Sequence, residues 1–439
     1  MPGAGIGPQS GKGASVDTLA PAQALDREAM ASRYRANRRR TAGLYALIAP
    51  EAYEEAPIPL RHPFVFYDGH IPGFAFITLV RDALKRPSVD PELERLFNRG
   101  IDPRDATVAA QLKRSAWPDR ATVRAFGDAC DAAIFDAYAT ARLDDPANPN
   151  LVRAEAAYTI LEHEDMHDET LTYIIHRLAR DKQRGLRFEH RDAAPPRLDP
   201  IAIPAGRATL GARRDAIPFG WDNEFDEHVV DVGAFGVDAY DVTNGEYLAF
   251  VRDGGPVPPN WFERDGAWML HAMFDDLPLP MSWPVWCSQE QASAFAQWSG
   301  ARLMTEAEYH RAAFGAPNGE ERAHPWGEDE PDPHRHGNFG WRRFDPEPAG
   351  SSPQGASAFG VHDLVGNGWE WTATRFAPFE GFRPMASYPL YSADFFDGMH
   401  YVMKGAAPVT ASNLVRRSLR NWFYYDYPYM DATFRRAYG

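Results

Sequence analysis

Cysteine is almost absent from this sequence, with Cys130 and Cys287 the only two among 439 residues. The two lie far apart along the chain and fall in different predicted domains. So few thiols exclude a disulfide framework and a cysteine metal cluster on count alone.

Long apolar segments and an excess of basic residues are also missing. No run reaches membrane-spanning length, and the first residues lack the apolar core of a signal peptide, so we expect a cytoplasmic protein without membrane contact. Lysine and arginine number 46 against 61 aspartate and glutamate, and the net charge of -15 argues against nucleic acid as a partner. The basic run Arg38-Arg39-Arg40 is local, and we interpret it as a solvated helix face.

Hydrophobic residues make up 44% of the chain and aromatic residues 13%, which indicates a globular protein of two or three domains. Residues 1–20 are rich in Gly, Ala, Ser and Pro without periodicity and are expected to form a disordered tail. Residues 21–191 then show four amphipathic stretches, for which a four-helix bundle is the economical architecture. The expected helices cover about 26–48, 64–84, 119–142 and 151–180.

Composition changes at a Pro-rich linker, residues 192–199. Over residues 200–439 long helical patterns give way to Gly, Pro and Trp with short apolar runs, which predicts an irregular α+β domain with much loop. Helical pattern returns only at about 289–299 and 305–314. The second of these begins with a capping box, because Thr305 can accept a hydrogen bond at N3 and Glu308 can reach back.

Two histidines stand one helical turn apart in the fourth helical stretch. Four-residue spacing places His163 and His167 on one face, which continues with apolar residues toward the bundle interior. A buried i, i+4 histidine pair suits a metal ion, and a pair of hydrogen-bonded core histidines is the alternative. His70, on the second stretch among apolar neighbours, is the expected third ligand.

The stretch from His163 to His167 also matches the HExxH pattern of zinc proteases, in which Glu164 would be the general base. However, the positions at which metzincins continue with Gly and His hold Thr170 and Tyr173. Three neutral histidines leave about three positions open on an octahedral ion, which suits iron(II) that must hold two substrates and O2. A structural zinc ion would instead require a fourth protein ligand.

Motifs in the second half of the chain resemble a sulfatase-modifying-factor domain, an FGE-like α+β fold related to C-type lectins. The bundle adds Gly69-His70 with Phe74, and the HExxHxET motif. Together they make residues 25–437 resemble the ergothioneine-pathway sulfoxide synthases, the EgtB type, whose bundle is DinB-like. The C-terminal motifs are Phe219–Phe225, Asp241–Tyr247, Ala301–Tyr309, Pro325–Gly327 and Gly360–Thr372.

The resemblance implies a non-haem iron(II) centre on His70, His163 and His167. It also implies an O2-dependent oxidoreductase that joins a small thiol, cysteine or γ-glutamylcysteine, to the imidazole ring of hercynine (trimethylhistidine) and oxidises the sulfur. The expected small-molecule partners are therefore hercynine, a thiol or selenol donor, and O2.

The sequence departs from the better-known branch of this family at three places. Met166 stands where that branch has Gln, and Phe423 where its Arg-Asn-Trp-Asp motif has the acid. Phe396-Asp397-Gly398 replaces a Tyr-Asn-Gly motif that carries the catalytic tyrosine, so a proton donor must come from elsewhere. The catalytic candidates are Tyr424, Tyr425 and Asp426. The substrate-binding candidates are Met166, Trp369, Asn421, Trp422 and Phe423, with Arg99, Arg417 and Arg420 for carboxylates.

Several alternatives remain open. A selenoneine synthase shares the architecture but takes a selenosugar, and an ovothiol-type enzyme accepts unmethylated histidine. The C-terminal domain alone suggests a formylglycine-generating oxidase, which uses a cysteine pair in its C-terminal part, but no cysteine follows Cys287. The same domain type also serves as a non-catalytic, lectin-like binding fold, and iron content would separate such a scaffold from an enzyme. Ordinary core packing is the alternative for each aromatic candidate.

Overall fold

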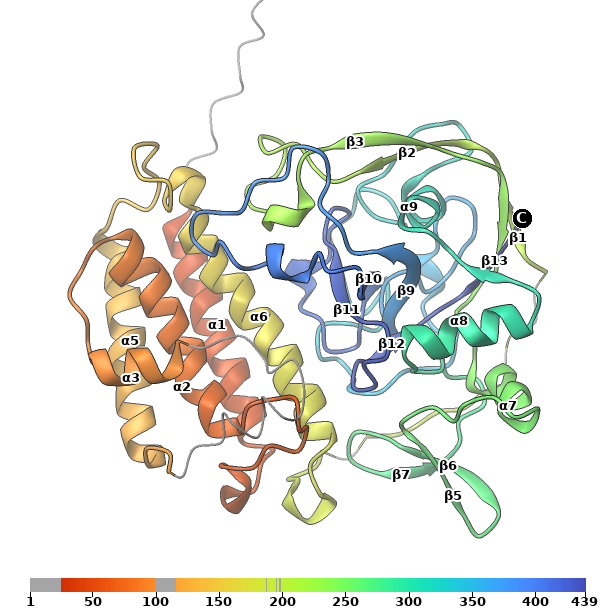
Figure 1. The fold of residues 1–439 in the computed structure, drawn as a ribbon, viewed down its shortest axis with the longest axis horizontal. Coiled ribbons are helices and arrows are strands. Elements are labelled where there is room, and N and C mark those ends of the chain that lie inside the picture. Colours follow the sequence, from red (N-terminus) through yellow and green to blue (C-terminus); the bar gives the residue numbers. More distant parts are fainter. Residues whose placement is uncertain (1–24, 99–115, 187, 195, 197–198) are drawn as a thin grey trace, which may run out of the picture.

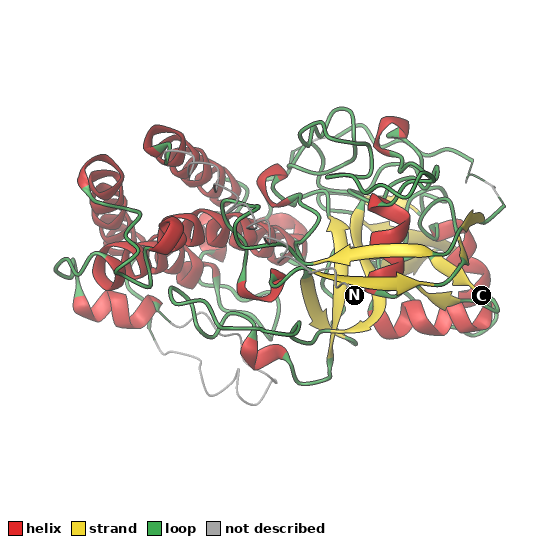
Figure 2. Ribbon diagram, turned by 90° about the horizontal axis from the view of Figure 1, so that it is seen from above, coloured by secondary structure: helices red, strands yellow, loops and turns green. Residues whose placement is uncertain are grey.

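The computed structural model describes residues 25–98, 116–186, 188–194, 196 and 199–439. A helical part and a part that contains all the described strands lie side by side (Figure 1, Figure 2). The predicted fold class, a helical bundle followed by an irregular α+β domain, is therefore confirmed. The predicted tail, residues 1–20, and the candidate Arg99 lie outside the described residues.

Four long helices form the bundle, and each coincides with a stretch whose periodicity predicted a helix. Asp26 and Asp119 cap the first and third of them by accepting hydrogen bonds from backbone N–H groups three residues later. The long helices are α1 Arg27–Tyr45, α2 Phe64–Ala75, α5 Arg120–Thr140 and α6 Glu155–His176. No described helix is long and apolar enough to cross a membrane.

Two local features of the bundle differ from the prediction. The stretch expected as one helix over 64–84 changes after Ala75 into a π-helical segment, Phe76–Ala83. Pro72 inside α2 has no N–H to donate to the preceding turn, so the regular hydrogen-bond ladder is interrupted just before this change. A short helix, α3 Pro91–Phe97, was not predicted because seven residues are too few to show periodicity, although Asp90 caps it.

The basic run on α1 is not a solvated face, and that interpretation is wrong for two of its three residues. Arg38 donates to Glu164 at 2.9 Å, and Arg40 donates to Asp168 at 2.7 Å. The side chains of Arg38 and Arg40 are only 19% and 24% exposed, whereas Arg39 is exposed. The run therefore neutralises the buried acidic face of α6, which the charge pattern of α1 alone does not reveal.

The C-terminal part is built from short elements. The two helical patterns predicted there are α8 and α9, and α9 begins with the expected capping box of Thr305 and Glu308. Another helix, α7, was not predicted, although Thr243 and Glu246 form the same kind of box at its start. The three helices are α7 Asn244–Arg252, α8 Gln289–Trp298 and α9 Glu306–Phe314.

The described strands form four small sheets, ordered β1-β4-β13-β8, β11-β10-β9-β12, β2-β3 and β5-β6-β7. In the second sheet β10 and β11 are antiparallel, and His400 lies opposite Tyr424. β11 is the edge strand on the side of the sheet that faces α6 (Figure 1). The strands are β1 Ile201–Ile203, β2 Gly206–Leu210, β3 His228–Val232, β4 Phe235–Val237, β5 Trp261–Arg264, β6 Ala267–His271, β7 Asp276–Pro278, β8 Arg302–Leu303, β9 Gly368–Arg375, β10 His400–Ala406, β11 Asn421–Tyr424, β12 Ala432–Thr433 and β13 Arg436–Tyr438.

A largely buried arginine joins the two parts of the molecule. Arg416 makes a bidentate contact with Glu162 of α6, at 2.8 and 2.9 Å, and also contacts Glu224 of the C-terminal part at 2.5 and 2.9 Å. Both carboxylates are buried, so each depends on this guanidinium for its neutralisation. The main hydrophobic cluster also includes residues from both parts, which places α6 inside a shared core.

Candidate metal centre and substrate cavity

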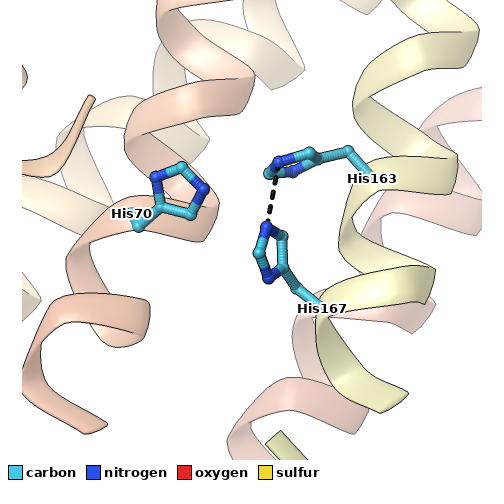
Figure 3. A group of neighbouring side chains, drawn as sticks. All are labelled: His70, His163 and His167. Atoms are coloured by element: carbon cyan, nitrogen blue, oxygen red, sulfur yellow. Dashed lines mark hydrogen bonds between the residues drawn. The ribbon is translucent and has the colours of Figure 1, made fainter. Parts of the chain in front are cut away.

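Three histidines from two helices meet inside the bundle (Figure 3). His70 lies on α2, His163 and His167 lie on α6, and their candidate ligand atoms are all within 4.8 Å of one another. The Nε2 atoms of His163 and His167 are 3.1 Å apart. Two nitrogens about 2.1 Å from one ion and at right angles would be about 3.0 Å apart, so this pair has the spacing of neighbouring ligands.

His70 is oriented by the backbone. Its Nδ1 donates to the carbonyl oxygen of Phe97 at 2.6 Å, which leaves Nε2 as the ring nitrogen with a free lone pair. That Nε2 is buried and has no partner among the described residues. A satisfied pair of core histidines, the alternative considered above, does not account for this third, unpartnered nitrogen, whereas a metal ion does.

The two histidines of α6 are held by packing instead of by hydrogen bonds to their outer nitrogens. The Nδ1 atoms of His163 and His167 are buried without partners in the part of the chain that is described. Phe74 stacks on His163 with ring centroids 3.6 Å apart. Burial lowers the pKa of all three histidines, that of His70 to about 4. They are therefore neutral at physiological pH, the form that binds metals.

Glu164 does not face the histidines. Its carboxylate accepts hydrogen bonds from Arg38 at 2.9 Å and from Thr41 at 2.6 Å, on the face of α6 that packs against α1. The side chain is 1% exposed. Because a general base must reach the water that it activates, this geometry removes the protease role suggested by the HExxH pattern.

A cavity of about 290 Å³ opens beside His163 and His167. Its wall is formed largely by α6, by the paired strands β10 and β11 and by the loop that precedes β10, and most of its surface is apolar or aromatic. Such a cavity suits a small organic ligand with a few polar groups. The predicted residues that line it are Met166, Trp369, Arg420, Asn421, Trp422, Phe423 and Tyr424.

Three other predicted residues are not brought to the cavity. Arg417 forms an ion pair with Glu321 at 2.9 Å. Asp426 is exposed, and neither it nor Tyr425 belongs to the cavity wall. They follow Tyr424, the last residue of β11, where the chain turns away. The structure thus gives no support to a catalytic role for Tyr425 and Asp426, or to a carboxylate-binding role for Arg417.

Arg420 lines the cavity, but its guanidinium is already saturated. It pairs with Glu306 through two hydrogen bonds of 2.9 and 3.1 Å and donates to the carbonyl oxygens of Asn223 and Ala377. The side chain is 2% exposed. A substrate carboxylate would therefore have to compete with a buried ion pair, which argues against the predicted role.

Arg61 is a cation of the cavity wall that the sequence did not reveal. Its Nε donates to the hydroxyl of Tyr427 at 3.0 Å. The guanidinium carbon lies 5.3 to 5.7 Å from the ring centroids of Tyr173, Phe423 and Tyr427. These rings come from distant segments of the chain, so no local pattern around residue 61 could have indicated the site. Arg61 therefore places a positive charge at the cavity wall.

Tyrosines of the loop before β10 were also missed. Tyr388 lines the cavity, and its ring centroid lies 6.2 Å from that of His163 and 5.0 Å from that of Phe74. Burial raises the pKa of Tyr388 to about 12, so its phenol keeps its proton at neutral pH. The hydroxyl of Tyr391 donates to the sulfur of Met166 at 3.3 Å, which fixes the side chain that replaces the family's Gln.

Glu169 is a buried carboxylate of the cavity wall. Its two oxygens accept hydrogen bonds from the indole N–H of Trp369 at 2.5 Å and from the hydroxyl of Thr410 at 2.8 Å. Among the described residues no cation influences its pKa, which burial raises to about 7. Trp369, predicted to bind substrate, therefore also holds Glu169 in place, while Trp371 is a core residue that donates to the carbonyl of Cys287.

Known proteins match both parts of the chain. The model of the DinB superfamily matches residues 33–171, and that of the sulfatase-modifying factor enzyme 1-like domain matches residues 189–438. A hercynine oxygenase of Mycolicibacterium thermoresistibile is 32% identical over 84% of this chain and 85% of its own length. That of Mycolicibacterium smegmatis is 30% identical over 92% of this chain and 96% of its own length.

A more distant relative is the ergothioneine biosynthesis protein 1 of Neurospora crassa. It is 25% identical over 87% of this chain and 54% of its own length. The two bacterial relatives, in contrast, are covered over most of their length. The chain therefore belongs to the EgtB-type, or hercynine oxygenase, family.

Proposed function

We propose that this protein is an ergothioneine-biosynthesis enzyme that uses iron(II) and O2 to join hercynine and a small thiol through a new C–S bond. Two relatives are named hercynine oxygenases, which supports hercynine as the first substrate. The observation that carries the proposal is the group of His70, His163 and His167 at the wall of a substrate-sized cavity. When bound there, iron(II) supplies the redox chemistry and open coordination positions.

The cavity wall offers complementary groups for an amino-acid betaine. The faces of Trp422 and Phe423 can attract a trimethylammonium group by cation–π interaction. Arg61 can pair with the substrate carboxylate through its planar guanidinium. Held at both ends, the substrate presents its imidazole ring to the histidine group in a fixed orientation, which lowers the entropic part of the barrier.

Tyr388 is the proton-holding residue that we assign beside this centre. Its phenol lies on the wall next to His163 and keeps its proton at neutral pH. The family's tyrosine position holds Phe396 in this chain. Tyr388 can therefore supply a proton from a different point of the same loop.

The function is tested by anaerobic reconstitution with iron(II). Hercynine or unmethylated histidine is added with cysteine, γ-glutamylcysteine or a selenosugar in parallel, and O2 uptake and product mass are followed. We expect uptake and a sulfoxide product with hercynine and one of the thiols. Uptake only with the selenosugar would move the assignment to a selenoneine synthase, and uptake with histidine would move it to an ovothiol-type enzyme. No uptake with any pair would refute the proposal.

A further inference from the structure

An aspartate–histidine pair, Asp397 and His400, lies in the cavity wall. The Nδ1 of His400, at the start of β10, lies 2.9 Å from Oδ1 of Asp397. The backbone N–H of Met399 donates to that same oxygen at 2.8 Å, which fixes the carboxylate. Because a carboxylate oxygen accepts, Nδ1 carries the proton, and Nε2 is left as the basic nitrogen of the ring.

The ring of His400 forms part of the cavity wall. It is 4% exposed, its centroid lies 4.0 Å from that of Tyr424, and Phe395 packs against its edge at 5.2 Å. All three residues line the same cavity as His163 and His167. Among the hydrogen bonds of the described residues, the ring makes one through Nδ1 and none through Nε2, so Nε2 is open to a ligand in the cavity.

We propose that His400, oriented by Asp397, is the acid–base residue that exchanges a proton with the chalcogen donor. The assignment rests on the proposed function, since it requires a second substrate with an S–H or Se–H group. In the step that we assign, the chalcogen–hydrogen bond breaks and an Nε2–H bond forms. The electron pair stays on the chalcogen, nothing is oxidised or reduced, and the proton leaves for solvent when His400 is deprotonated again.

Two features of the pair suit this step. An ordinary thiol has a pKa near 8.5, so at neutral pH it must lose a proton to become a nucleophile or a ligand. Burial lowers the pKa of His400, and the hydrogen bond to Asp397 opposes that effect, so the ring starts neutral and its protonated form is stabilised. Asp397 and Tyr424 are the titratable groups that contact the ring among the described residues.

The contact between Asp397 and His400 offers a physical reason for the departure from the family's Tyr-Asn-Gly motif. The resemblance assigns a Tyr-Asn-Gly sequence to the positions of Phe396-Asp397-Gly398. The first change removes a phenol, and the second replaces a neutral amide by the carboxylate that holds His400. An asparagine at 397 could accept the same hydrogen bond but would not stabilise an imidazolium by charge.

The inference can be tested without turnover. Protein loaded with zinc, which has no redox chemistry, is saturated with hercynine and titrated with each chalcogen donor at pH 7. Calorimetry in two buffers of different ionisation enthalpy gives the number of protons released. We expect wild-type protein to release fewer protons per donor bound than His400→Gln, because the negative charge of the bound chalcogen opposes the lowered pKa of His400 and lets the ring keep part of the proton. His334→Gln, at an exposed histidine outside the cavity wall, is the matched control.

Turnover of the iron form provides a second readout. His400→Gln should lower the rate at pH 7 by about 10²-fold and regain part of it as the pH approaches 9, where the donor ionises unaided. Asp397→Asn should change proton release and the rate at pH 7 in the same directions, but by less. This variant replaces His400→Gln in both experiments if His400→Gln does not fold. Equal proton release by wild type and both variants would overturn the role of His400 while leaving the proposed function intact. Failure of every donor to bind wild-type protein would overturn both.

Discussion

The bundle and the C-terminal part contribute to the cavity in contrasting ways. The bundle provides three histidines at regular positions of two helices, where the helical repeat fixes the direction of each side chain. The C-terminal part provides most of the cavity wall from β11 and from loops, where direction depends on tertiary contacts. The contrast separates two tasks: the helices hold the candidate metal ligands, and the C-terminal strands and loops complete the wall of the cavity.

Helix α6 belongs to both tasks because different faces of it meet different neighbours. One face carries the histidines, a second is acidic and pairs with the arginines of α1, and a third contacts the C-terminal part through Glu162 and Glu169. Changes on each face should therefore have separable effects.

The largest effect is expected on the histidine face. His163→Ala removes one of three ligands, so the protein should no longer retain iron and should lose turnover by about 10⁴-fold or more. Metal analysis and O2 uptake measure the two losses. His176→Gln is a control on the same helix, since His176 bonds to the carbonyl of His271 and lies outside the histidine group. Normal iron content in His163→Ala would contradict the site.

A large loss of stability is expected at the junction of the two parts. Arg416→Met leaves Glu162 and Glu224 buried without their guanidinium, which should cost about 3–5 kcal/mol in the free energy of unfolding. Chemical denaturation measures the cost. Adding Glu162→Gln and Glu224→Gln to that variant should restore part of the stability, and an unchanged denaturation midpoint for Arg416→Met would show that the junction contributes little.

A smaller, purely catalytic effect is expected on the loop side. Tyr388→Phe removes only the phenolic proton, so turnover should fall by about 10²-fold while iron content and the melting temperature stay unchanged. Tyr401→Phe, which keeps its place on β10 outside the cavity wall, is the matched control. Full activity of Tyr388→Phe would return the search for the proton donor to other residues.

The acidic face of α6 should affect stability more than chemistry. Glu164→Gln weakens the contacts with Arg38 and Thr41, which should cost about 1–3 kcal/mol in stability. Iron content and turnover per folded molecule should remain within about threefold of wild type, because the carboxylate does not face the metal ligands. A collapse of turnover without loss of folding would revive a direct catalytic role for Glu164.

The smallest effect concerns pH and lies outside the cavity. Burial raises the pKa of Asp363 to about 6, above its unfolded value, so the folded state binds an extra proton between about pH 4 and 6 and loses stability as pH rises through this range. Asp363→Asn removes that loss, and Asn tolerates the left-handed backbone at this position, φ 52°. The free energy of unfolding should rise by about 1–2 kcal/mol at pH 8 and change little at pH 4. Equal effects at both pH values would contradict the shift.

The features that could be predicted from the sequence are those that lie on regular helices. Periodicity located the four bundle helices, and i, i+4 spacing placed His163 and His167 on one face. The sequence motifs of both parts indicated the EgtB-type family. Arg61, Glu169 and Tyr388 were missed because their position in the wall depends on rings and donors from distant segments. The ion pairs of Arg417 with Glu321 and of Arg420 with Glu306 could not be predicted for the same reason, since the partners are not near each other in sequence.

The arrangement around Arg416 has a consequence for how the molecule unfolds. Because α6 is packed against α1 on one side and tied to the C-terminal part on another, neither part can open without releasing the helix that bears two of the candidate ligands. Iron that binds only the folded chain would then raise the unfolding temperature of both parts together, as one cooperative transition. The metal would thus act on the whole protein as a stabilising ligand, including loops that it never touches.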